Sequence, residues 1–120
     1  MTRLAAFALL LLVPPAFPQD SASKQALPAP DAVRGKELYV KYTCYACHGF
    51  DGHGGAGARL VPMKMLLPVF TAYIRSPRQM PAYRAKVISD AQLGDIWAYI
   101  KSIPESPAPQ KIPLLKELSQ

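Results

Sequence analysis

Residues that bind metals or form covalent bonds through sulfur are few in this sequence. Its 120 residues include only two cysteines and two histidines. All four lie within one short stretch, as Cys44, Cys47, His48 and His53. Chemistry that depends on a thiol or an imidazole is therefore confined to this stretch, and a second site of the same kind in this chain is excluded.

Long apolar runs are also missing, apart from one near the N-terminus. Residues 4–13 form an apolar run that follows Arg3 and ends at Pro14 and Pro15. The run is shorter than the about 20 residues that span a membrane, and its pattern predicts a secretory signal peptide over about residues 1–18. We expect an exported, soluble protein of the bacterial periplasm. Membrane association is expected only if the leader stays uncleaved or through a partner complex.

Acidic residues are scarce relative to basic ones. The chain has 14 Lys and Arg against 8 Asp and Glu, which gives a formal net charge of +6. Such a charge favours partners with an acidic surface. The basic residues are scattered and no nucleic-acid-binding motif accompanies them, so no nucleic acid partner is expected.

The sequence CYACH at residues 44–48 is typical of covalent haem c attachment. Its two thiols lie one helical turn apart and can bond the porphyrin, while the imidazole of His48 binds the iron. A redox dithiol, a zinc site that adds His53, and a disulfide are the alternatives. A dithiol is expected within a βαβ pattern, which this chain lacks. Zinc is disfavoured because Cys47 and His48 are adjacent, whereas structural zinc ligands come in separated pairs.

Two segments are expected to be helices that pack against each other. Asp31 is a suitable N-cap for a helix to about Tyr42. Ser89 and Gln92 form a capping box for a second helix that Pro104 stops. A close crossing is predicted by small residues on both helices, at Gly35, Gly94 and Ala98.

These helices and a short apolar helix over residues 69–74 are expected to form one small domain, over residues 31–103. Residues 19–30 are expected to be a flexible linker between the signal peptide and the domain. Residues 104–120 form a Pro-rich C-terminal tail. We expect this tail to be mobile or to rest on the protein's own surface.

The loops between the helices supply the remaining candidate ligand. Residues 49–57 are rich in glycine and are expected to wrap closely around the haem edge, with His53 exposed to solvent. Met80 lies before Pro81 in a segment without helical or strand periodicity. Its thioether is a soft neutral donor, so Met80 is the leading candidate for the second iron ligand. Met63 and Met65 are the alternatives.

Over about residues 31–103 the chain resembles bacterial class I, monohaem cytochromes c. The resemblance rests on the motif at residues 44–48 and on the Met80-Pro81 pair. It also rests on two residues of each terminal helix, Gly35 and Tyr39, and Ile96 and Tyr99.

The resemblance implies an all-α fold in which the N- and C-terminal helices cross over one covalently bound haem c. It implies thioether bonds from Cys44 and Cys47, with His48 and Met80 as axial iron ligands. Members of this family commonly use a proline carbonyl to accept a hydrogen bond from the proximal histidine. Here residues 57–60 read Gly-Ala-Arg-Leu at that place, so the acceptor stays open.

The implied function is the transfer of single electrons between redox protein partners, without an enzymatic reaction. A cytochrome subunit docked on an extracytoplasmic dehydrogenase is the first alternative, and a haem enzyme with an open sixth site is the second. Basic side chains near the haem edge would steer an acidic partner. The candidates are Lys41, Arg59, Lys64, Arg78 and Arg84.

Overall fold

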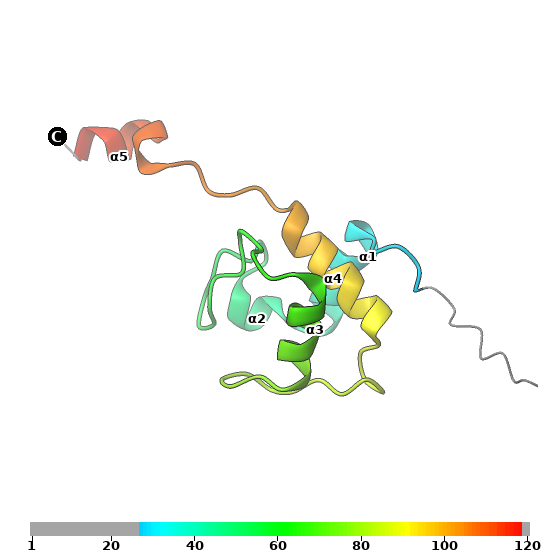
Figure 1. Cartoon of the computed structure of the whole chain (residues 1–120). Helices are drawn as coiled ribbons and strands as arrows, with labels where there is room; N and C mark the ends of the chain where they lie inside the picture. The colour runs from blue at the N-terminus through cyan, green and yellow to red at the C-terminus, as the bar shows by residue number, and fades with distance from the viewer. Residues whose placement is uncertain (1–26, 119–120) are drawn as a thin grey trace, which may run out of the picture.

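The computed structural model describes residues 27–118. The expected signal peptide and residues 19–26 of the expected linker lie outside this range. The described elements are α1 (Ala32–Lys41), α2 (Tyr45–His48), α3 (Leu67–Arg75), α4 (Asp90–Ser102), the 3-10 helix η1 (Pro109–Lys111) and α5 (Pro113–Leu118) (Figure 1). Over residues 27–118 there are no strands, which confirms the predicted all-α class.

The two terminal helices of the domain pack against each other through Gly35. A Cβ atom on Gly35 would lie 1.9 Å from the carbonyl oxygen of Asp95 and 2.8 Å from the Cβ of Tyr99. The rings of Tyr39 and Tyr99 meet edge to face beside this point, with centroids 5.4 Å apart. The predicted α1–α4 contact is therefore confirmed, and only glycine fits at its centre.

The prediction that Gly94 is the small residue of α4 that allows the close crossing with Gly35 is wrong. A Cβ on Gly94 would lie 3.5 Å from Pro30 and 3.8 Å from Leu67. Gly94 therefore faces the segment before α1 and the start of α3. The helical register places Asp95 and Tyr99 against Gly35, because residues four apart share a helix face.

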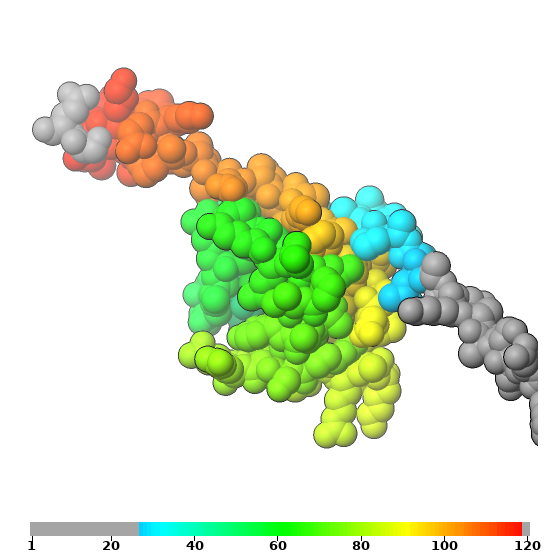
Figure 2. All heavy atoms as spheres, in the orientation of Figure 1, coloured from blue at the N-terminus to red at the C-terminus, as the bar shows by residue number. Residues whose placement is uncertain are grey.

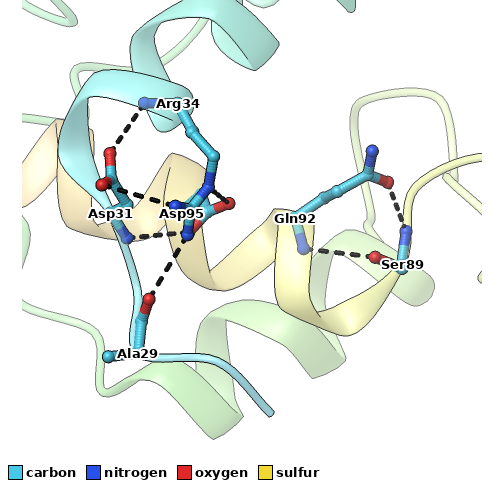
Figure 3. A network of polar contacts seen from close by, with 6 residues as sticks. All are labelled: Ala29, Asp31, Arg34, Ser89, Gln92 and Asp95. Carbon is cyan, nitrogen blue, oxygen red and sulfur yellow. Dashed lines mark hydrogen bonds and ion pairs between the residues drawn. The ribbon is translucent and has the colours of Figure 1, made fainter.

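A polar network closes the N-terminal end of the α1–α4 contact (Figure 3). Asp31 caps α1 by accepting from the backbone N–H of Arg34 at 2.9 Å. The backbone N–H of Asp31 donates to the Asp95 carboxylate at 2.7 Å. Arg34 donates to both Asp95 oxygens, from Nε and Nη2, at 3.0 Å each. The buried Asp95 charge is thus fully paired, as a buried carboxylate must be.

The start of α4 is fixed by the predicted capping box. The Ser89 hydroxyl accepts from the backbone N–H of Gln92 at 3.2 Å, and the Gln92 side chain accepts from the Ser89 N–H at 2.9 Å (Figure 3). Four residues of α4 and α1 contribute to the buried core, Tyr39, Leu93, Ile96 and Ile100. The other members of the core are Val61, Phe70 of α3 and Ile88.

The C-terminal tail leaves the domain instead of resting on it. α5 packs against η1, and both lie apart from the body formed by α1 to α4 (Figures 1 and 2). Near its start the tail makes a hydrogen bond to the domain. Nη2 of Arg59 donates to the hydroxyl of Ser106 at 3.0 Å. Among residues 27–118, no helix is long and apolar enough to cross a membrane.

Candidate functional site

Cys47 and His48 lie on α2, a single helical turn, and Cys44 is its N-cap residue. The backbone N–H of His48 donates to the carbonyl of Cys44 at 3.0 Å, which closes that turn. Both thiols are free, with Cys44 partly buried and Cys47 exposed. Burial raises the pKa of the Cys44 thiol. The spacing places both sulfurs and the imidazole at the same cavity, as the motif predicts.

This cavity has a volume of about 550 Å³, within the range of cofactor sites. Its apolar wall comes from the core, and the residues that line it include Tyr39, Phe70, Ile88, Leu93, Ile96 and Ile100. No Asp or Glu of the described residues lines it, whereas Arg59 and Lys64 do. The site is therefore an apolar pocket with basic residues and without carboxylates.

The imidazole of His48 has a defined hydrogen-bond partner. Its Nδ1 lies 2.7 Å from the carbonyl oxygen of Ala58, so Nδ1 carries the proton and donates. Nε2 is then left as the free electron-pair donor for a metal. The sequence left this acceptor open, and the structure assigns it to Ala58, at the place where the family commonly has proline.

Gly57 allows the Ala58 carbonyl to approach the ring. A Cβ at Gly57 would lie 3.0 Å from Cε1 and 3.1 Å from Nδ1 of His48. The backbone N–H of Gly57 donates to the carbonyl of Cys47 at 2.7 Å and holds the loop against α2. A side chain at Gly57 would push the ring and its acceptor apart.

The tyrosines of the α1–α4 contact hold the chain directly after His48. Tyr39 donates from its hydroxyl to the Gly49 carbonyl at 2.7 Å, and Tyr99 donates to the Phe50 carbonyl at 3.0 Å. Burial raises the pKa of both hydroxyls, so they remain neutral donors. The helix crossing therefore fixes where α2 ends.

Three thioethers line the cavity, those of Met63, Met65 and Met80. Met80 and Met63 are partly buried, whereas Met65 is exposed. The segment that holds Met65 is tied to α4, because Nε1 of Trp97 donates to the Met65 carbonyl at 2.8 Å. The structure thus brings the predicted Met80 to the same cavity as His48, together with both alternatives.

His53 does not face solvent as expected. Its side chain is 22% exposed, and neither ring nitrogen is accessible. Nδ1 lies 3.2 Å from the Asp51 carboxylate, yet neither ring nitrogen makes a hydrogen bond. In the described part of the chain, no three His, Cys, Asp or Glu residues come together as a metal-binding group. The zinc alternative gains no support from this geometry.

Comparison with protein families matches residues 30–100 to "Cytochrome C oxidase, cbb3-type, subunit III". The chain belongs to this cytochrome c family. It is therefore an electron-transfer domain that uses haem c, and the expectation that it is not an enzyme is confirmed.

Relatives among curated proteins are named "Cytochrome bc1 complex cytochrome c subunit". The chain is 32% identical over 90 residues to the one from Corynebacterium diphtheriae and 33% over 84 residues to that from Corynebacterium efficiens. These alignments cover 71% and 66% of this cytochrome. It spans only 32% and 28% of the relatives' own lengths. No solved structure matches the chain.

The residues of the cavity fit a covalently bound haem. Two thiols on one helical turn, an imidazole with Nε2 free and a large apolar wall are the groups that such a cofactor requires. The Ala58 carbonyl, the fit at Gly57 and the contacts of Arg75 described below were not found from the sequence. A Gly-Ala pair in place of Gly-Pro was the only signal for the first two.

Proposed function

We propose that residues 31–103 form a monohaem c-type cytochrome domain that transfers one electron at a time. The observation that carries this proposal is the hydrogen bond from His48 Nδ1 to Ala58, which leaves Nε2 free beside two thiols in one apolar cavity. When bound, the haem supplies an iron that cycles between the ferrous and ferric states. The protein residues attach the cofactor, supply axial ligands and adjust its potential.

Each of the four predicted residues has a separate role in this proposal. Cys44 and Cys47 would hold the porphyrin through thioether bonds. His48 would bind the iron through Nε2, and the Ala58 carbonyl would increase the basicity of the ring by accepting the hydrogen bond from Nδ1. Met80 would supply a thioether as the second protein ligand of the iron, which would raise the reduction potential.

The apolar wall of the cavity acts in the same direction as Met80. Oxidation of the iron adds one positive charge, and a low-dielectric surrounding penalises that charge. The buried side chains of Phe70, Leu93 and Ile96 line the cavity. Their burial therefore favours the ferrous state.

The proposed partners are redox proteins with an acidic docking surface. Of the five basic candidates, Arg59 and Lys64 line the cavity. The Arg59 side chain is less available to a partner, since its Nε already donates to the Val61 carbonyl at 2.7 Å and its Nη2 to Ser106. Lys64 is therefore the best candidate for steering. The proposed location is the bacterial periplasm, as the expected leader at residues 1–18 indicates.

The optical spectrum of protein exported in a haem-attaching host tests the ligand assignment. We expect a low-spin ferric spectrum with the weak long-wavelength band of a thioether–iron bond. Met80→Ala should abolish this band, while Met63→Ala and Met65→Ala, as matched controls in the same cavity, should retain it. A band that survives in Met80→Ala would contradict the assignment, and haem that separates under denaturing conditions would contradict covalent attachment.

A second candidate is a cytochrome subunit held permanently in a membrane oxidoreductase complex. The names of the relatives, which are subunits of a bc1 complex, favour it. Native purification in low and high salt distinguishes the two. Association that persists in high salt supports the subunit, and association lost with salt supports a free carrier, because salt screens contacts between exposed charges.

A further inference from the structure

Arg75, the last residue of α3, makes three side-chain hydrogen bonds. Its Nη1 donates to the carbonyl of Tyr83 at 2.7 Å. Its Nη2 donates to the carbonyl of Ile88 at 2.8 Å and to the Asp90 carboxylate at 2.5 Å. The side chain is only 22% exposed. Neither the attachment motif nor the sequence-based site includes this residue.

The two carbonyls that Arg75 binds belong to the segment that follows Met80. This segment, 76–89, has no helix of its own between α3 and α4. Tyr83 lies three residues after Met80 and lines the cavity. The backbone N–H of Tyr83 also donates to the Ile74 carbonyl at 3.1 Å, one residue before Arg75. The loop is therefore held to the end of α3 at one position by two hydrogen bonds.

Ile88 marks the other fixed point of the loop. Its side chain is 1% exposed and lines the cavity, and Arg75 binds its carbonyl from the outside. Asp90 is the first residue of α4, so the guanidinium joins α3, the Met80 loop and α4. A planar guanidinium can donate in several fixed directions at once, which a lysine ammonium cannot match.

We infer that Arg75 is a positioning residue that holds the Met80 loop in place, so that the Met80 thioether stays on the iron. The inference rests on the proposed ligation by Met80. An iron–thioether bond competes with other donors, and it persists only while the loop stays closed. Hydrogen bonds from a charged donor to the two loop carbonyls stabilise the closed state. Closure of the loop therefore depends on the hydrogen bonds from Arg75 to these two carbonyls, and not on the ion pair with Asp90 alone.

Binding of free imidazole to the ferric holoprotein measures loop opening. Imidazole takes the sixth position only when the loop is open, so its apparent affinity rises with the open fraction. We expect Arg75→Gln to tighten imidazole binding by about 10-fold or more, because two charge-assisted hydrogen bonds are lost. Arg75→Lys should give a smaller tightening in the same direction. The helical circular dichroism should stay unchanged in the same solutions.

Two variants serve as matched controls. Arg84→Gln makes the same chemical change in the same loop, at an exposed side chain that makes no hydrogen bond or ion pair within residues 27–118. It should leave imidazole binding unchanged. Asp90→Asn removes the ion pair and keeps both carbonyl contacts, and it should alter the affinity by less than about threefold.

The inference is overturned if Arg75→Gln binds imidazole like Arg84→Gln. It is also overturned if Asp90→Asn has the larger effect, or if tightening occurs only where the helical signal is lost. Should Arg75→Gln not fold, Arg75→Lys carries the test, with no tightening as the contradicting result. Met80→Ala is measured in parallel. Wild-type imidazole affinity in Met80→Ala would refute the ligand assignment itself, which is a different outcome from failure of Arg75 alone.

Discussion

Gly35 and Gly94 allow the same substitution to be tested at two buried glycines, with opposite expected effects on the free energy of unfolding. Gly35 lies in α1 at the α1–α4 contact, whereas Gly94 lies on the opposite side of α4. Replacing glycine by alanine in a helix stabilises it by about 1 kcal/mol when nothing obstructs the new methyl group. The two sites differ only in what that methyl group meets.

At Gly35 the methyl carbon would lie 1.9 Å from the Asp95 carbonyl oxygen and 2.5 Å from its carbon. These are backbone atoms, which cannot rotate away, so α1 and α4 must separate. Overpacking costs about 1–3 kcal/mol or more, and the Tyr39–Tyr99 contact loses about 0.5–1.5 kcal/mol. After subtracting the helix gain, Gly35→Ala should lower the free energy of unfolding by about 0.5–3.5 kcal/mol.

At Gly94 the nearest atoms, from Pro30 and Leu67, would lie at ordinary contact distances of 3.5 and 3.8 Å. Gly94→Ala should therefore raise the free energy of unfolding by about 0.5–1 kcal/mol. Urea unfolding followed by helical circular dichroism measures both variants of the holoprotein. Wild-type stability in Gly35→Ala, or an equal loss in both variants, would refute the packing argument.

Three further predictions concern buried polar groups and the histidine. Asp95→Ala should lower the free energy of unfolding by about 1–3 kcal/mol, because the Asp31 N–H and the half-exposed Arg34 guanidinium lose their acceptor; an effect as small as that of the exposed Glu37→Ala in urea unfolding would contradict it. The free energy of unfolding should fall above about pH 10, by up to about 1.4 kcal/mol per pH unit for the buried Tyr39. The sign follows because burial raises the pKa of Tyr39 in the folded state, so the unfolded chain loses its proton first; Tyr39→Phe should make the alkaline slope less steep, and an unchanged slope would argue against it. Gly57→Ala should displace the His48 ring from Ala58 and lower the basicity of the ligand; a shifted reduction potential is expected, and a potential identical to wild type would count against the role of Ala58.

The tail shows what an apolar pattern leaves undecided. From the sequence, the segment of Leu114, Leu115 and Leu118 is expected either to be mobile or to rest on the protein's own surface. All three stay exposed, and the tail is tied to the domain at Ser106 by Arg59. An apolar pattern shows that a segment is amphipathic, but only the available surface of the folded domain determines whether it packs.

By itself, the sequence determined the features that depend on residues close together in the chain. The spacing of Cys44, Cys47 and His48 on one helical turn, the N-cap at Asp31 and the capping box at Ser89 are local, and the structure has all of them. These patterns are readable because each is set by backbone geometry over three or four residues.

Only the tertiary structure decided which distant groups meet. Gly35 faces Asp95 instead of Gly94, Ala58 supplies the acceptor for His48, and Arg75 binds the loop that carries Met80. Each of these contacts depends on helix register and on the path of a loop, which a small rotation or shift changes completely. The motif alone therefore predicts where a haem would be attached, whereas the contacts of His48 and of the Met80 loop come from packing between segments far apart in the chain.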